Sequence, residues 1–201
     1  MKVISSASED VMIALFLEGE LVSTRFGDAI RTELKKDALP VNIIRYPDTT
    51  NVADNYARRE ILSETRGYEQ RKELFTGFPK DVTWMNVQIT KAELALVKYI
   101  KYSYWEEITN GSRLPKDAAS TIENGREVFG VSNTGFLDAA KVLRAGRKFP
   151  TMIFVGDDNG KLVVLEGHLR LTAFALAWDA VPQCVNVLLG TSAHMAEWSC
   201  F

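Results

Sequence analysis

The chain has 201 residues, with 24 Lys and Arg, 26 Asp and Glu, two His and two Cys, for a formal net charge of −2. A content of 46% hydrophobic and 25% charged residues is typical of a globular protein that can bury a sizeable core. The near-neutral charge argues against a protein that coats nucleic acid through bulk electrostatics, but it leaves a local basic site open.

Membrane, export and metal-binding patterns are missing from the sequence. The longest apolar run, 11–17, is far shorter than the roughly 20 residues of a spanning helix, and acidic residues flank it where a secretory signal would not carry them. Cys184 and Cys200 have neither zinc-ligand nor redox-pair spacing. We therefore expect free thiols, no protein metal site and a cytoplasmic location.

Residues 1–80 predict an N-terminal helical lobe. Ser8 suits the N-cap of a helix over the apolar run, and Phe26, Ile30 and Leu34 then recur at helical spacing. A turn at 46–48 follows.

A long polar helix is expected after that turn, ending near Gly67. Its basic residues and those just after it alternate with glutamates, which favours a salt-bridged, solvated face over a nucleic-acid patch. These basic residues are Arg58, Arg59, Arg66, Arg71 and Lys72.

Residues 81–201 predict a mixed α+β domain. A strand over 82–89 leads to Thr90 and Glu93, which form a capping-box pattern for a helix that carries Leu94, Val97 and Ile100. Two further helices are expected, one from Pro115 to Gly125 and one through Phe136, Ala140 and Leu143.

The clearest local pattern is a hairpin followed directly by a helix. Apolar runs at 151–155 and 161–165 flank Asn159-Gly160, a dipeptide that favours a tight turn. The second run continues through Glu166-Gly167-His168 into an apolar helix over 169–178, and 184–189 reads as a closing strand.

The start of that helix is the predicted functional site. A strand that turns over a glycine into a helix aims unpaired N–H groups and the positive end of the helix dipole at one point, which attracts phosphate. Arg170 lies unfavourably for the dipole and needs an anion, and His168 adds a titratable group that is a candidate for catalysis as well as for phosphate binding. The alternative is structural: Glu166 and Arg170 pair across the turn, and a backbone carbonyl satisfies His168.

The segment Glu166-Gly167-His168-Leu169-Arg170 resembles the signature motif of the ParB/sulfiredoxin-like superfamily. The upstream helix, Gly146, Phe149-Pro150 and the strand at 151–155 extend the resemblance over about 82–190. It implies a ParB-like nucleotide-binding domain at 81–201. Leu169 stands where sulfiredoxins carry a catalytic Cys, and no helix-turn-helix of chromosome-partition proteins follows the motif.

The motif is most similar to that of the free serine kinase branch, in which it holds nucleotide phosphates while an upstream Glu acts as base. The resemblance therefore implies ATP or CTP with Mg²⁺ as cofactors, and phosphoryl transfer to a small hydroxyl-bearing metabolite. Glu106 and Glu107 are the candidates for the base, each with a solvated helix end as the alternative. Arg113 is a candidate for a bound phosphate or carboxylate.

Asn133 is a further candidate substrate contact, although Ser132-Asn133-Thr134 reads most simply as a helix N-cap. Two other functions stay open: a non-enzymatic nucleotide-binding or DNA-associated regulatory module, and an interaction scaffold with a decayed pocket. Residues 1–80 give no functional pattern.

Overall fold

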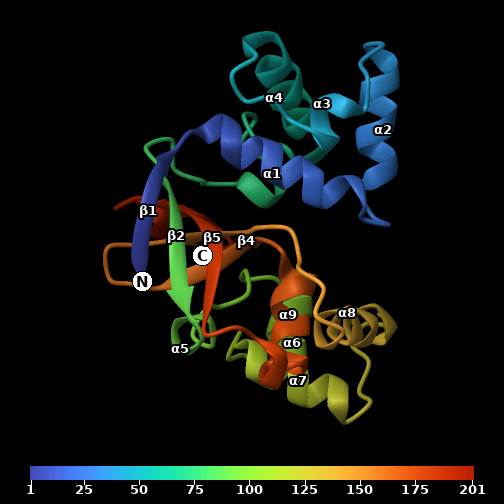
Figure 1. The fold of residues 1–201 in the computed structure, drawn as a ribbon, viewed down its shortest axis with the longest axis vertical. Helices are drawn as coiled ribbons and strands as arrows, with labels where there is room; N and C mark the ends of the chain where they lie inside the picture. Colours follow the sequence, from blue (N-terminus) through green and yellow to red (C-terminus); the bar gives the residue numbers. More distant parts are fainter.

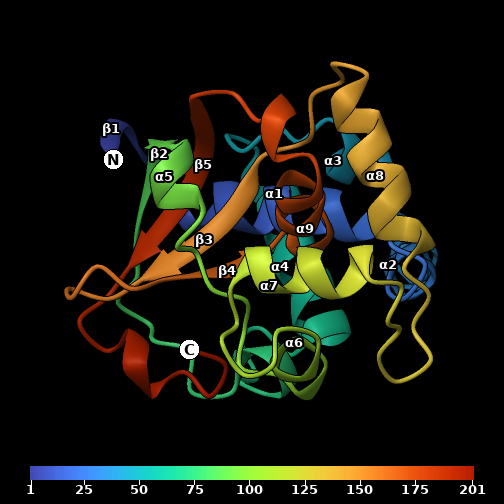
Figure 2. The ribbon, with the colours of Figure 1, turned by 90° about the horizontal axis from the view of Figure 1, so that it is seen from below.

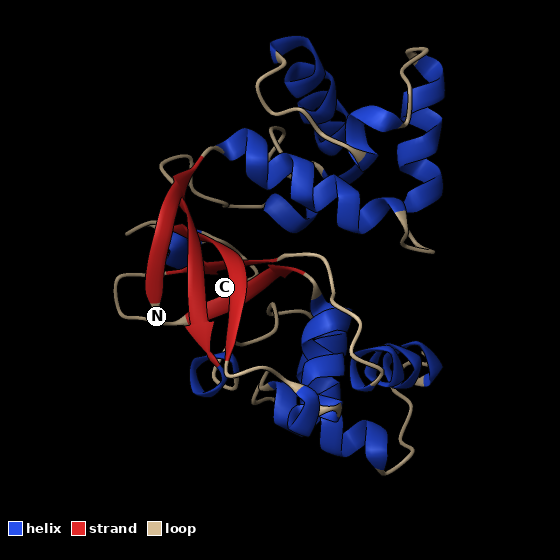
Figure 3. Cartoon of the chain, viewed as in Figure 1, coloured by secondary structure: helices blue, strands red, loops and turns tan.

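The computed structural model describes residues 1–201 and has an α+β fold built on one five-stranded mixed sheet. The strands are β1 (Lys2–Ala7), β2 (Thr83–Thr90), β3 (Met152–Gly156), β4 (Leu162–Glu166) and β5 (Cys184–Thr191). Their spatial order is β1-β2-β5-β3-β4, and only the β5–β3 pair is parallel. Figure 3 shows the sheet between two groups of helices.

The helices lie on the two sides of this sheet. Figure 1 shows the first four gathered on one side and α6 to α9 on the other, and Figure 2 shows the same arrangement from below. The helices are α1 (Glu9–Leu21), α2 (Gly27–Lys36), α3 (Asn42–Arg45), α4 (Val52–Arg66), α5 (Lys91–Leu94), α6 (Ser103–Ile108), α7 (Pro115–Glu123), α8 (Thr134–Arg144) and α9 (His168–Leu176). Three 3₁₀ turns, Glu73–Phe75, Trp178–Ala180 and Met195–Glu197, complete the fold.

Several local predictions are confirmed. The Ser8 side chain accepts a hydrogen bond from the Val11 amide at the start of α1, and Gly67 ends α4 in the left-handed conformation. Pro115 opens α7. β3 and β4 form the predicted antiparallel hairpin, which leads directly into α9.

The sequence did not predict β1. All but the last of its residues are exposed, so the strand lacks the alternation of buried and exposed side chains that marks a half-buried strand. It forms because it pairs with β2, where Val3 lies opposite Val87 and Ser6 opposite Met85. A region expected to be helical thus adds an edge strand to the sheet.

The helix expected from Thr90 through Ile100 is wrong in length. The capping box between Thr90 and Glu93 is present, but α5 ends at Leu94. Beyond it the Lys98 amide donates to the Leu162 carbonyl at 2.8 Å, and the Val164 amide donates back to the Lys98 carbonyl at 2.9 Å. The edge of β4 therefore competes for this backbone and prevents a second helical turn.

The prediction of a solvated basic face is also wrong for Arg58, which is completely buried. Its guanidinium donates to the carbonyls of Ile43 and Asp48 at 2.8 and 2.9 Å, and to the Asn55 side chain. These bonds tie the turn before α4 to the helix. Alternation of charge along a helix does not reveal a cation whose acceptors are backbone carbonyls.

The buried apolar side chains form one continuous core. Phe16 of α1, Phe75 and Phe154 of β3 belong to the same cluster, so the first helices and the sheet share it. None of the helices combines the length and the apolar character that crossing a bilayer needs. Both cysteines are free thiols.

Candidate functional site

The β4–α9 junction depends on Gly167. This residue has φ 105° and ψ 24°, a left-handed conformation that favours glycine. A Cβ at this position would lie 2.7 Å from Cγ of Met152, so a side chain would also clash with β3. α9 begins directly after this glycine, and no side chain caps the first turn of the helix. The amides of that turn therefore have no side-chain acceptor.

A second helix start lies beside the first. α8 begins after Asn133, whose own side chain does not cap it, although the Ser132 hydroxyl oxygen accepts from the Thr134 amide at 3.3 Å. A Cβ on Gly135, the second residue of α8, would lie 3.9 Å from Cδ1 of Leu169, the second residue of α9. Two positive helix ends thus converge, and Leu169 is 45% exposed at this point. This arrangement favours an anion.

Arg170 is held by the protein itself. Its guanidinium forms an ion pair with Glu166, and Nη1 donates to the carbonyls of Pro150 and Thr151 at 3.0 and 2.9 Å. Burial lowers the pKa of Arg170 to about 10, with Glu18 and Glu20 acting in the opposite direction, so it is a cation at neutral pH. The pairing that the structural alternative expected between these two residues is present.

His168 does not follow that alternative. Its ring stacks on Trp105, with centroids 5.2 Å apart, and Nε2 is buried without a hydrogen-bond partner. Burial, aided by the charges of Arg66 and Arg25, lowers the pKa of His168 to about 3. The imidazole is therefore neutral at pH 7 and retains an unused polar atom.

The first helices bring charges to this junction that sequence reasoning missed. A Cβ on Gly19 of α1 would lie 2.7 Å from Oε1 of Glu166, so α1 packs directly on that carboxylate. Arg66 lies 3.8 Å from Glu20 and 3.7 Å from the ring centroid of Phe26. Arg25 is exposed nearby and forms no ion pair. No local pattern links residues so far from the motif.

The two candidate bases, Glu106 and Glu107, form no bond with the α9 junction. Glu107 pairs with Arg126 at the surface, and both side chains are about half exposed. Glu106 forms no ion pair and acts at a distance on Arg113. Neither carboxylate bonds to the α9 junction, although the preceding residue, Trp105, contacts His168.

The predicted substrate contacts also differ in setting. Arg113 is buried, and its guanidinium donates to the carbonyls of Tyr99, Phe201 and Cys200 at 2.8, 2.9 and 3.3 Å, so it fastens the C-terminal segment. Asn133 lies at the start of α8, donates to the Arg126 carbonyl at 3.0 Å, and has a buried Oδ1 without a partner. Of these two, Asn133 lies at the helix starts.

The residues at the junction fit an anion better than a metal. First-turn amides without a side-chain acceptor and nearby Arg25 are suited to phosphate, and Nε2 of His168 is a buried polar atom without a partner. No group of three or more His, Cys, Asp or Glu side chains is arranged to hold a metal ion. Two cavities, of about 430 and 260 Å³, are lined by other residues.

The fold and the junction define an α+β protein with a glycine-turned helix start at the edge of a mixed sheet. Comparison with protein-family models, with curated proteins and with solved structures gives no match for this chain. The resemblance to the ParB/sulfiredoxin-like superfamily accordingly rests on the motif and on the hairpin-to-helix order.

Proposed function

We propose that this chain is a ParB-like nucleotide-binding protein that holds nucleotide phosphates where α8 and α9 begin. The observation that carries the proposal is the closeness of two helix starts at Gly135 and Leu169, neither of which is capped by the side chain of its N-cap residue. The first-turn amides and Arg25 would contact the phosphates. Arg170 would act as a positioning residue, because Glu166 and two carbonyls already engage it.

Phosphoryl transfer from ATP or CTP to a small hydroxyl-bearing metabolite is the enzymatic form of this proposal. It is supported by Trp105, which contacts His168 and is followed by Glu106, the candidate base. Mg²⁺ enters only as the ion that accompanies the nucleotide and would neutralise phosphate charge.

A non-enzymatic regulatory module is the second candidate. It is favoured by the contact of α1 with Glu166, because a ligand that displaced this carboxylate would alter the packing of the first helices. Both forms need the same phosphate site, so nucleotide binding is tested first.

Calorimetric titration of the full chain with ATP and with CTP, each with and without Mg²⁺, is the first test. Leu169→Glu puts a carboxylate at the helix starts, and a negative charge there does not harm the helix. We expect affinity to fall about tenfold or more, which corresponds to at least about 1.4 kcal/mol. Val142→Glu, on a similarly exposed residue at the far end of α8, is the matched control.

The titration also separates the alternatives. Binding of neither nucleotide, or equal affinity in Leu169→Glu and wild type, would refute the phosphate site. Turnover that needs a hydroxyl compound and is lost in Glu106→Gln or Glu107→Gln would support the kinase form. Binding without turnover would support the regulatory form, and DNA retention that falls steeply with salt would add a DNA partner to it.

A further inference from the structure

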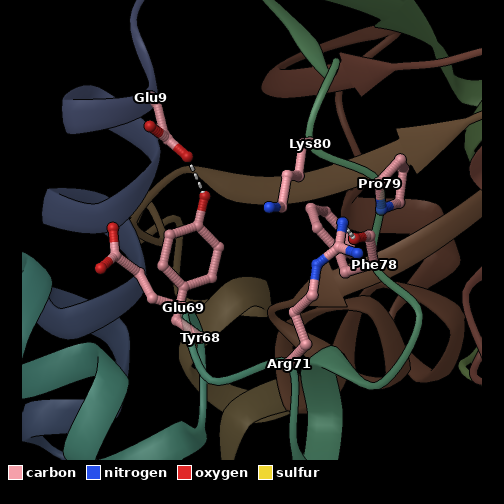
Figure 4. A pocket seen from close by; sticks show the side chains of 7 residues that line it. All are labelled: Glu9, Tyr68, Glu69, Arg71, Phe78, Pro79 and Lys80. Atoms are coloured by element: carbon pink, nitrogen blue, oxygen red, sulfur yellow. Dashed lines mark hydrogen bonds between the residues drawn. The ribbon is translucent and has the colours of Figure 1, made fainter.

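A cavity far from the motif in sequence has the features of a second binding site. It has a volume of about 430 Å³, within the range of small-molecule sites, and lies between α1, the segment after α4 and the segment before β2 (Figure 4). Its lining residues are Glu9, Tyr68, Glu69, Arg71, Phe78, Pro79 and Lys80.

One side of this cavity carries excess negative charge. Arg59, just behind it, pairs with three carboxylates: Glu9 at 2.9 Å, Asp10 at 3.2 Å and Glu69 at 3.1 Å. The Tyr68 hydroxyl donates to Glu9, and burial together with Glu9 raises the pKa of this phenol, which keeps its proton. Glu9 and Glu69 line this side and Asp10 lies behind it, so the single Arg59 guanidinium leaves an excess of negative charge.

The other side carries two cations that no carboxylate neutralises. Arg71 donates to the Phe78 carbonyl at 2.7 Å and forms no ion pair, and Lys80 makes no side-chain bond. Figure 4 shows the Lys80 ammonium reaching across the cavity towards Tyr68, with the Arg71 guanidinium beside Phe78. The cavity is therefore dipolar, with separated acidic and basic sides.

The basic side is held in place. Arg71 and Glu73 have φ of 50° and 49°, a backbone region that is uncommon for non-glycine residues. Phe78 packs edge-on against Phe75 and Trp198, each at 5.4 Å between centroids. This packing fixes the segment that presents Lys80.

We propose that this cavity binds a small zwitterion of the amino-acid class, with its carboxylate towards Lys80 and Arg71 and its ammonium towards Glu69. Only one oxygen of Glu69 is engaged by Arg59, which leaves the other to accept from an ammonium. The acidic side would repel a simple anion, and the basic side would repel a simple cation. A molecule with both charges satisfies both, and this proposal does not depend on the nucleotide site.

The test is a titration of the ¹⁵N-labelled full chain with a panel of the standard L-amino acids, followed through the backbone amides of 68–80. The tightest binder is then compared with the amine that lacks its carboxylate and the acid that lacks its ammonium. We expect each analogue to bind about tenfold more weakly or worse. Lys80→Ala should weaken the amino acid at least as much.

Lys72→Ala is the matched control, because Lys72 is exposed on the same segment but does not line the cavity. Circular dichroism establishes that both variants fold. A panel that leaves the signals of 68–80 unchanged, an analogue that binds as tightly as the amino acid, or equal binding in Lys80→Ala and wild type would each overturn the proposal.

Discussion

The α9 junction and the dipolar cavity use charge in opposite ways. At the junction, Glu166 and Arg170 are four residues apart, almost fully buried, and paired with each other. In the cavity, acidic and basic groups come from three separate segments, are more exposed, and face each other across open space. The first arrangement stabilises the fold, and the second leaves charge available to a ligand.

This difference shows why a motif and a binding site need not coincide in detail. A buried cation without its partner is costly, so the motif carries its own counter-ion. The polar groups that this ion pair leaves without a side-chain partner are backbone amides and Nε2 of His168. The cavity instead offers whole charges, because water can solvate them when no ligand is bound.

Replacing Arg170 by Met should produce the largest loss of stability. It leaves the Glu166 carboxylate buried without a counter-ion and frees the carbonyls of Pro150 and Thr151, so the free energy of unfolding should fall by about 3–5 kcal/mol. Lys141→Met, which breaks an exposed pair with Asp138, should cost less than about 1 kcal/mol. Urea denaturation measures both, and equal losses would contradict the contrast between buried and exposed charge.

The local parts of the fold could be predicted from sequence. The β3–β4 hairpin, the proline start of α7 and the cap of α1 each depend on residues within a few positions of one another. β1 and the end of α5 depend instead on pairing with strands far along the chain. Local patterns do not carry that information.

The same limit applies to the candidate sites. The strand-glycine-helix junction was predictable because Gly167, His168 and Arg170 are adjacent in sequence. The contact of Gly19 with Glu166 and the closeness of Gly135 to Leu169 could not be predicted, because tertiary packing brings these residues together. The dipolar cavity had no sequence pattern at all: Arg71 was predicted to belong to a solvated face, and no prediction was made for Lys80.

His168 provides a second contrast between the junction and the cavity. Its imidazole is neutral and buried, whereas the charged groups of the cavity are hydrated. Its pKa lies near 3 in the folded state against 6.5 unperturbed, so below pH 6.5 the unfolded chain binds the proton first. Stability should therefore fall as pH decreases towards 3, with a limiting slope of about 1.4 kcal/mol per pH unit.

His168→Phe keeps a ring against Trp105 but removes this titration. The difference in unfolding free energy between wild type and variant should change by about 1 kcal/mol between pH 7 and pH 5.5, in favour of the variant. Comparison of the two proteins cancels the carboxylates that titrate in both. A difference that stays constant with pH would show that His168 has the same pKa in the folded protein as in the unfolded chain.

Removal of Arg59 should have the smallest effect and the strongest dependence on salt. Arg59→Met leaves three carboxylates, Glu9, Asp10 and Glu69, facing one another in a partly exposed setting, so we expect a loss of about 0.5–1 kcal/mol at low ionic strength. Added salt screens their repulsion, and the loss should shrink in 1 M NaCl. The loss in Arg170→Met should stay nearly unchanged, because that pair is shielded from solvent. If both losses respond equally to salt in urea denaturation, the two regions do not differ in solvation, and the charges of the cavity are not free to meet a ligand.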